Sequence, residues 1–386
     1  MQSIEVYATE KLASLEAKHL RRVLIDTARD GDIWVKRSGK KILSFSCNDY
    51  LNLTQHPLVK EAAVSAIKAF GVGAGASRLV TGNHPLFRSL ETRLAKLKGT
   101  KAACVFGSGY LANTGIIPIF VGKNDLILMD ELAHACLWTG ANVAGTKTLI
   151  FRHNNLNHLT DLLEKNRGKH KRALIATDGV FSMDGDLAPL PGLCDIADKY
   201  DAWLLSDDAH GIGVVGNGRG SSFAHNTTTN IPLQMGTLSK AIGSYGGYIC
   251  AADSVIDLIK TRARTLIYST GLPPANIAAA IAALDIIEKE PGYAALPLQK
   301  AQTFTEHAGL PTAVSPIVPV IIGDAEKALA ASRMLEDEGY LVTAIRPPTV
   351  APGTARLRIT FTAAHPNTEI IKLANIIRSR IIKGET

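Results

Sequence analysis

Residues 173–211 read ALIATDGVFSMDGDLAPLPGLCDIADKYDAWLLSDDAHG, and they show the pattern that organises the middle of the chain. Two apolar runs, ALIAT (173–177) and AWLLSD (202–207), flank a segment with apolar residues at helical spacing. Similar apolar runs recur at 102–106, 126–129, 148–151, 233–236 and 247–251. Apolar strands that alternate with helices are typical of a mostly parallel sheet covered on both faces. We therefore predict an α/β fold.

The chain of 386 residues exceeds one ordinary domain. Residues 1–30 alternate apolar and charged positions at helical spacing, and from about Pro273 an Ala-rich helical stretch leads into a smaller α+β region. We predict an N-terminal helix with short strands at 1–49, a large α/β domain at 50–275 and a small α+β domain at 276–386. The N-terminal segment is expected to join the small domain.

Composition and charge narrow the classes of partner. The net charge is +7, but Lys and Arg are spread out, and the densest cluster (165–172) reads as a solvated loop, so we expect no nucleic acid. A basic surface suits anionic small molecules or an acidic carrier protein. The N-terminus lacks the apolar core of a signal peptide, and no apolar run approaches the ~18 residues that cross a bilayer. We expect a soluble, cytoplasmic protein without membrane contact.

Asp207 and Asp208 end the apolar run AWLLSD, and His210 follows closely. A carboxylate at the end of a buried strand is costly unless a cation pairs with it. A protonated pyridinium is one such cation, while a helix cap or a loop ion pair is the ordinary alternative. Taken alone, this motif leaves both interpretations open.

Lys240 lies in GTLSKAIGSYGG (236–247), a tight loop with small hydroxyl residues and glycines. A lysine that forms a Schiff base needs a partly desolvated amine, although most single lysines are surface charges. Upstream, VFGSGYLANTGII (105–117) turns from a strand into a helix, whose first N–H groups make a phosphate seat. His134 opens another predicted helix after the run LILM and suits stacking on an aromatic cofactor; a plain helix-end histidine is the alternative.

Two other patterns are set aside. GIGVVG (211–216) matches the dinucleotide pattern G-x-G-x-x-G, but the residues after it do not open a helix, which argues against NAD. His153 and His158 have no Cys, Asp or Glu at ligand spacing, and the five cysteines include no C-x-x-C pair. We expect neither a metal site nor disulfides.

Together these motifs resemble the α-oxoamine synthase family of pyridoxal-5′-phosphate (PLP) enzymes, which have the aspartate-aminotransferase fold. The likeness runs from NDYLNL (48–53) through GAGASRLVTGNHPLFRSLE (73–91), DGVFSMDGDLAPL (178–190), DDAHG (207–211) and TLSKAIG (237–243) to IRPPTVAPGTARLRITFTAAH (345–365). The chain has Asp178 where the family pattern has Glu, and its lysine loop is less Gly-rich.

The resemblance implies a role for each matching residue. Lys240 is expected to carry PLP and to act as the acid–base group, with Asp207 on the pyridine nitrogen. His210 is expected at the phenolic oxygen and His134 stacked on the ring. The other expected cofactor contacts are Gly109, Tyr110, Ser182 and Thr237. Arg21, His134, Thr349 and either Arg356 or Arg358, with Arg358 preferred, are expected to contact the substrates.

Within the family, the tail RPPTVAPGTARLR and the pair Arg21-Arg22 resemble the branch that joins L-alanine to a pimeloyl thioester with loss of CO2. The resemblance also implies a homodimer with active sites near the interface, and an acyl donor carried on CoA or an acyl carrier protein. Other members of the family, with other amino acids and acyl groups, remain alternatives. A non-catalytic partner subunit is the alternative of another class, and the joint presence of Lys240, Asp207 and His210 argues against it.

Overall fold

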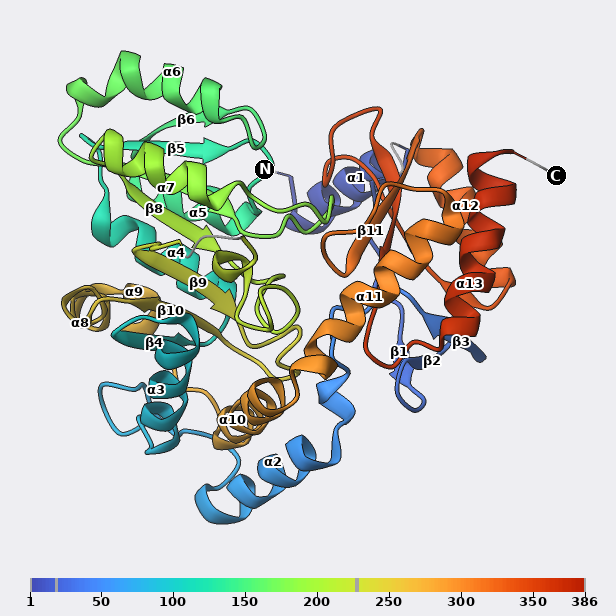
Figure 1. The fold of residues 1–386 in the computed structure, drawn as a ribbon, viewed down its shortest axis with the longest axis horizontal. Coiled ribbons are helices and arrows are strands. Elements are labelled where there is room, and N and C mark those ends of the chain that lie inside the picture. The colour runs from blue at the N-terminus through green and yellow to red at the C-terminus, as the bar shows by residue number, and fades with distance from the viewer. Residues whose placement is uncertain (1, 18–19, 226–228, 385–386) are drawn as a thin grey trace. The chain divides into compact units, whose positions relative to one another are not determined.

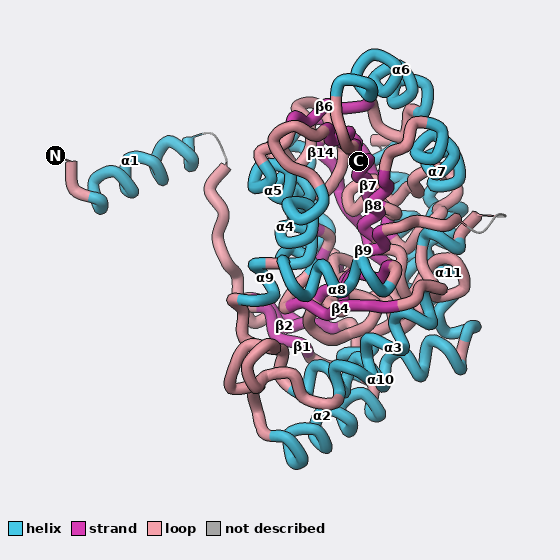
Figure 2. Tube along the Cα trace, turned by 90° about the vertical axis from the view of Figure 1, so that its left-hand side faces the viewer, coloured by secondary structure: helices cyan, strands magenta, loops and turns pink. Residues whose placement is uncertain are grey.

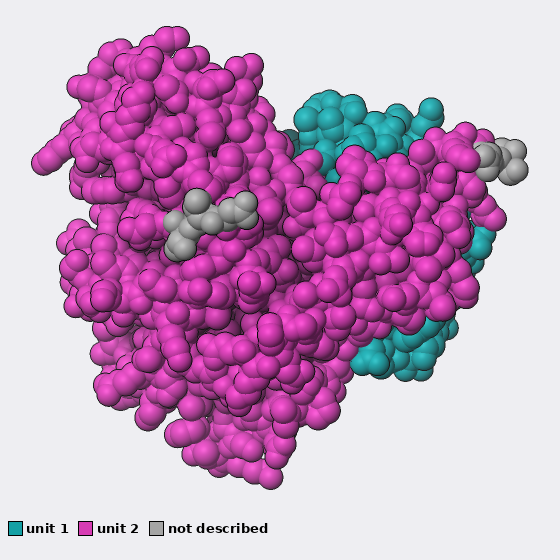
Figure 3. Space-filling view, in the orientation of Figure 1, with its two compact units in different colours: residues 1–46, 319–359 teal, residues 47–318, 360–386 magenta. Residues whose placement is uncertain are grey.

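A computed structural model describes residues 2–17, 20–225 and 229–384 of the chain. The chain forms two compact units, which Figure 3 colours separately. The smaller unit combines residues 1–46 with 319–359, and the larger unit combines residues 47–318 with 360–386. The domain limits that we expect at residues 50 and 275 remain a prediction, because they concern where separate domains begin and end rather than which residues are in contact.

The larger unit is built on a seven-stranded sheet, whose strands lie one below another in Figure 1, from β6 at the top to β4 at the bottom. Its strand order is β4-β10-β9-β8-β7-β5-β6, and β10 alone runs against its neighbours β4 and β9. The predicted mostly parallel α/β sheet is therefore confirmed. The strands are β4 (Ala102–Phe106), β5 (Leu126–Asp130), β6 (Lys147–Phe151), β7 (Ala173–Asp178), β8 (Trp203–Asp207), β9 (Leu233–Thr237) and β10 (Gly247–Ala251).

Helices cover both faces of this sheet. Ala103 and Val105 of β4 pack in one hydrophobic cluster, while the alternating Cys104 and Phe106 pack in another, because successive side chains of a strand point to opposite faces. The helices of this unit are α2 (Pro57–Phe70), α3 (Leu86–Lys98), α4 (Gly109–Phe120), α5 (Ala135–Ala144), α6 (Leu156–Asn166), α7 (Leu190–Lys199), α8 (Asp253–Arg262), α9 (Arg264–Ile267), α10 (Pro274–Lys289), α11 (Pro291–Ala308) and α13 (Asn367–Ile376). Short helical turns lie at Leu53–Gln55, Arg167–Lys169, Ser221–Phe223 and Ile377–Ile382.

The smaller unit contains two short sheets and the helices α1 (Ile4–Ala17) and α12 (Ala325–Asp337). Figure 2 shows α1 in cyan and β1, β2 and β14 in magenta. The first sheet has the order β1-β2-β3-β12 and the second β11-β14-β13. Their strands are β1 (Thr27–Arg29), β2 (Trp34–Arg37), β3 (Lys40–Ser44), β11 (Ile317–Gly323), β12 (Tyr340–Leu341), β13 (Thr343–Ile345) and β14 (Ala355–Thr360).

The expected helix over residues 1–30 is only partly correct. α1 ends at Ala17, so Arg21 and Arg22 lie beyond it rather than at its end, and residues 18 and 19 fall outside the described part. No residue of α1 is buried. Downstream, residues 27–29 form strand β1 and pair with β2, since the ladder satisfies their backbone groups.

The glycines around 211–220 enclose a buried ion pair instead of a dinucleotide. Lys98 Nζ lies 2.6 Å from Asp208 Oδ2, and both side chains are almost completely buried. A Cβ atom at Gly211 would lie 2.0 Å from Asp208 Oδ1, and one at Gly220 would lie 1.8 Å from Oδ2. The segment 211–216 forms turns rather than the start of an α-helix. The pattern GIGVVG therefore reflects close packing around Asp208.

No helix within the described ranges is long and apolar enough to cross a bilayer.

Candidate active site

The candidate site lies at the carboxyl edge of the large sheet. Asp178 ends β7 and Asp207 ends β8, and the two residues are register partners. Thr237 ends the next strand, β9. Polar side chains from parallel strands meet at this edge, which is where α/β sheets bind ligands. A cavity of about 190 Å³ opens there, lined by Gly109, Tyr110, His134, Cys136, Asp178, Val180, Asp207, Ala209, His210, Met235, Thr237 and Lys240.

Lys240 lies against a histidine in this cavity. Its Nζ is 2.6 Å from His210 Nε2, and the other ring nitrogen, Nδ1, is 2.6 Å from Tyr50 Oη. The lysine follows β9 in a turn that Ser244 N closes on the carbonyl of Leu238. A lysine amine held beside an imidazole can exchange protons with a bound substrate.

Asp207 is buried and is held by hydrogen bonds rather than by a cation. Asn113 Nδ2 donates to its Oδ2 at 2.7 Å, and the backbone N–H of Ala209 donates to its Oδ1 at 2.9 Å. Among the residues that the structure describes, no Lys, Arg or His makes an ion pair with this carboxylate. A buried carboxylate that faces a cavity in this way suits a cationic ligand group.

His134 and Asp178 form the opposite side of the cavity. His134 precedes α5, and its backbone N–H donates to Asp178 Oδ1 at 3.0 Å. Burial lowers the pKa of His134, and burial together with the nearby Asp207 carboxylate raises the pKa of Asp178. The imidazole is therefore neutral at neutral pH, a state that suits stacking on a flat ring.

The start of α4 supplies free backbone N–H groups beside the cavity. Gly109 is its first residue, and a Cβ there would lie 3.0 Å from Met235 Cε and 3.7 Å from Thr237 Oγ1. A Cβ at Gly247 would lie 2.5 Å from the backbone N of Gly109. Glycines at both positions keep the helix N-terminus open, and such a terminus is an anion-binding site.

Comparison with known proteins agrees with this geometry. A family model described as Aminotransferase class I and II matches residues 40–377. The chain belongs to this family. It is 60% identical over 377 residues to a protein of Caulobacter vibrioides named "Putative 8-amino-7-oxononanoate synthase", covering 98% of each chain. It is 58% identical over 377 residues to the 8-amino-7-oxononanoate synthase of Beijerinckia indica, again covering 98% of each.

Solved structures of this family are similar over nearly the whole chain. A serine palmitoyltransferase from S. paucimobilis with a bound PLP–myriocin aldimine matches with a TM-score of 0.89 and 27% identity, covering 96% of each chain. An 8-amino-7-oxononanoate synthase from Francisella tularensis matches with a TM-score of 0.76 and 27% identity, covering 89% of this chain and 98% of the other. These findings confirm the predicted aspartate-aminotransferase-like fold and the predicted PLP-dependent acyltransferase of the α-oxoamine synthase type.

The cofactor is PLP. The residues in the cavity fit it chemically. Asp207 offers a buried carboxylate without a protein cation, the start of α4 offers backbone N–H groups for a phosphate, and Lys240 offers an amine between them. When bound, PLP supplies an electron sink for negative charge at the α-carbon of an amino acid.

Most of the predicted cofactor residues meet in this cavity, and Ser182 does not line it. Ser182 lies in the turn that Phe181 and Gly185 close by a backbone hydrogen bond of 2.9 Å. Thr237 Oγ1 donates to the carbonyl of Gly246 at 2.8 Å, so a phosphate would have to compete for that proton. Tyr110 is half exposed, with its Oη 3.3 Å from Thr139 Oγ1. The assignment of each contact remains a prediction.

The predicted substrate residues outside the cavity belong to the smaller unit. Arg356 and Arg358 are buried on β14, two residues apart and therefore on one face of the strand. Arg21 Nη1 lies 2.5 Å from Glu16 Oε2 in an exposed ion pair. Arg22 Nη2 reaches Thr349 Oγ1 at 3.4 Å. Their roles toward substrate also remain predictions.

Sequence reasoning missed three contributors to the site. Asn113, Tyr50 and Cys136 contact Asp207, His210 and His134 respectively, with Cys136 Sγ 2.8 Å from His134 Nδ1. All three lie inside motifs that carry the family resemblance, namely SGYLAN, NDYLNL and HAC. Asn113 and Tyr50 contact residues that are far away in the chain, so sequence spacing does not reveal these two contacts.

Proposed function

We propose that the protein condenses L-alanine with a pimeloyl thioester, releases CO2 and forms 8-amino-7-oxononanoate for biotin biosynthesis. The relatives near 60% identity with that name carry this proposal, because they cover 98% of the chain. The solved structures of both kinds share 27% identity with the chain and do not separate the two activities. Serine with a long acyl chain is the less favoured alternative, and acetyl or succinyl donors with glycine are others.

The cavity residues have complementary tasks in this reaction. Asp207, fixed by Asn113, would hold PLP by its pyridine nitrogen and keep that nitrogen protonated. The Lys240 amine takes the proton from the amino-acid α-carbon and returns a proton after CO2 has left. His134 covers the ring and limits water, and Arg358 binds the amino-acid carboxylate through two parallel hydrogen bonds. Arg21 binds the distal carboxylate of the pimeloyl chain.

A substrate matrix tests this proposal. Purified protein is given alanine, glycine or serine, each with acetyl, succinyl, pimeloyl or palmitoyl thioester, and CO2 release is measured. Alanine with pimeloyl thioester should be the fastest pair, and Lys240→Ala should abolish release. The same matrix with CoA and with an acyl carrier protein as donor identifies the carrier. A faster pair of another amino acid and acyl group would overturn the choice of substrates and leave the family in place.

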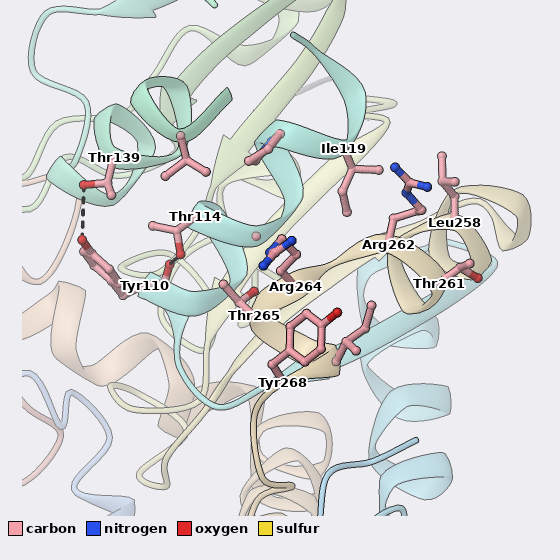
Figure 4. Close-up of a pocket in the computed structure, with 14 residues that line it drawn as sticks. Tyr110, Thr114, Ile119, Thr139, Leu258, Thr261, Arg262, Arg264, Thr265 and Tyr268 are labelled. Carbon is pink, nitrogen blue, oxygen red and sulfur yellow. Dashed lines mark hydrogen bonds between the residues drawn. The ribbon is translucent and has the colours of Figure 1, made fainter. Parts of the chain in front are cut away.

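We also propose that the protein is a homodimer with active sites near the interface, working in the cytoplasm. A hollow of about 890 Å³ is lined by parts of α4, α5, α8 and α9 (Figure 4). Tyr110 and Tyr268 line this hollow and are 50% and 74% exposed, so they present aromatic surface that a partner could cover. Ser269 and Thr270 follow directly, and Thr270 bridges to Ser77. These exposed side chains support a surface for a second copy.

Hybrid dimers test the shared site. Lys240→Ala and a double alanine variant at Ser269 and Thr270 are each expected to be inactive. If a dimer combines residues of both copies in one site, mixed protein should regain part of the activity. No recovery, with subunit exchange confirmed by tagged copies, would refute a shared site.

A further inference from the structure

Tyr50 is a buried tyrosine that contacts His210 of the candidate site. Its side chain is 0% exposed and belongs to the hydrophobic core, yet its Oη lies 2.6 Å from His210 Nδ1. On the other side of the same ring, Nε2 lies 2.6 Å from Lys240 Nζ. The imidazole therefore stands between a phenol in the core and the lysine in the cavity.

The two contacts constrain where the imidazole carries its proton. A neutral imidazole has one N–H and one acceptor nitrogen, so the two ring contacts run in opposite senses. If the Tyr50 hydroxyl donates to Nδ1, the N–H is on Nε2 and faces Lys240. If Nδ1 instead donates to Tyr50, Nε2 is an acceptor and the cavity loses a hydrogen-bond donor.

A cofactor oxygen beside Nε2 would favour the first arrangement, because an anionic oxygen can only accept a hydrogen bond, and the Tyr50 hydroxyl is placed to complete it. The Tyr50 hydroxyl has one proton, and its distance to His210 Nδ1 is 2.6 Å against 3.3 Å to Asn48 Oδ1. A contact of 2.6 Å is at the short end of the range for a hydroxyl donor, whereas 3.3 Å is beyond it. The proton of the phenol is therefore directed to the imidazole.

We propose that Tyr50 is a positioning residue that donates to His210 Nδ1 and thereby keeps the ring N–H on Nε2, directed into the cavity. With PLP bound, this N–H would be available to an anionic oxygen of the cofactor, because an ammonium group of Lys240 can only donate a hydrogen bond. The inference rests on PLP as the cofactor and is independent of which amino acid and acyl donor are used.

The backbone around Tyr50 holds the phenol in place. Asp49 organises the turn that follows, since its carbonyl accepts from Asn52 N at 2.8 Å and its carboxylate accepts from Thr54 Oγ1 at 2.5 Å. The carbonyl of Tyr50 itself accepts from Ala363 N at 2.7 Å. Replacing tyrosine by phenylalanine keeps these contacts and the packed ring, and removes only the hydroxyl.

Tyr248 provides a matched control. It is also 0% exposed, and its Oη has no hydrogen-bond partner within the described residues. Tyr50→Phe and Tyr248→Phe thus make the same chemical change at two buried positions, of which one touches His210. A purely structural role for both rings predicts equal behaviour of the two variants.

The experiment compares PLP binding and the histidine tautomer. Apoenzyme is titrated with PLP, and Tyr50→Phe should bind about 3- to 10-fold more weakly, the effect of one ordinary hydrogen bond. Its pH titration of the bound-PLP absorption band should also shift, while Tyr248→Phe matches the wild type in both. In ¹⁵N-histidine-labelled wild-type holoenzyme, with His210 assigned from a His210→Gln variant, Nε2 should be protonated and Nδ1 unprotonated.

Each contrary result overturns the proposal. A wild-type signal with the proton on Nδ1 excludes the tautomer, even if Tyr50→Phe does not fold. Equal PLP affinity and an equal absorption titration for Tyr50→Phe and the wild type show that the hydroxyl has no such role. An equal loss in Tyr248→Phe assigns the effect to packing. If the protein is inactive toward alanine and pimeloyl thioester, the PLP affinity, the absorption titration and the histidine tautomer are unaffected. The proposed substrates and the proposed role of Tyr50 can therefore be refuted independently.

Discussion

His153 is held between two carboxylates, and this arrangement predicts a pH-dependent contribution to stability. Its Nδ1 lies 3.1 Å from Asp130 Oδ1, and its Nε2 lies 2.7 Å from Asp186 Oδ2. Burial opposes the charged ring, but the hydrogen bonds and charges of Asp130 and Asp186 prevail and raise the pKa of His153 to about 10. At neutral pH His153 is therefore protonated in the folded protein. Its charged ring binds Asp130 at the end of β5 and Asp186 in the loop after β7.

The size of the contribution of His153 to stability follows from the rise in its pKa on folding. A group whose pKa is raised on folding stabilises fully below its unfolded value of ~6.5, and the stabilisation is lost as pH rises through the folded value. The maximum loss is ~1.4 kcal/mol per pH unit, or ~2.7 kcal/mol between pH 7 and pH 9. The side chain of His153 is 22% exposed, so solvent screening reduces this. We expect ~1–2.5 kcal/mol.

The perturbation is His153→Gln, because glutamine keeps a hydrogen-bonding side chain and cannot become cationic. Thermal unfolding of the wild type and the variant is measured at pH 7 and at pH 9 and equal ionic strength. The difference between their unfolding midpoints should be smaller at pH 9 by about 2–10 °C, at roughly 2–4 °C per kcal/mol. His158→Gln is the control, since His158 Nδ1 accepts a backbone N–H from Arg152. If the difference in unfolding midpoint between the wild type and His153→Gln is the same at both pH values, the protonated His153 does not stabilise the folded protein in this way.

Three further variants test separate parts of the structure. Asp207→Asn should retain PLP but slow α-deuterium exchange of labelled alanine by about 100-fold or more, because an amide does not hold the pyridine nitrogen protonated; near wild-type exchange would count against the pairing. Arg21→Ala should raise the KM for pimeloyl thioester and leave that for alanine nearly fixed, and equal shifts or none would remove Arg21 from the site. Gly220→Ala should lower stability by at least ~2 kcal/mol in urea unfolding, as its φ is 102° and a Cβ would meet Asp208, whereas Gly168→Ala has free space and should change little.

The strands of the large sheet could be predicted from the sequence, and the reason is their burial. β5, β7 and β9 are buried at every position, so they appear as continuous apolar runs between turn residues. The reversed direction of β10 could not be predicted, because GYICA has the same apolar pattern whichever way it runs. The N-terminal helix was overestimated, since an exposed segment with weak periodicity carries little information.

The meeting of Lys240 and Asp207 in one cavity could be predicted, because each directly follows or ends an apolar strand. Their supporting contacts could not. Asn113 reaches Asp207 across 94 residues, and Tyr50 reaches His210 across 160. The same holds for His153, whose partners Asp130, at the end of β5, and Asp186, in the loop after β7, lie 23 and 33 residues away in the chain. Such contacts depend on the order of the strands in the sheet, and local sequence patterns carry no information about that order.

The central claim is that Lys240 carries the cofactor, and one chemical measurement tests it directly. Borohydride reduction of the yellow holoenzyme fixes PLP to the lysine that holds it, and peptide mapping then identifies that residue. We expect the label on Lys240, the lysine 2.6 Å from His210 in the cavity, and none in the Lys240→Ala variant, which should also lack turnover. A label on any other lysine, or an adduct that survives in Lys240→Ala, would contradict the account.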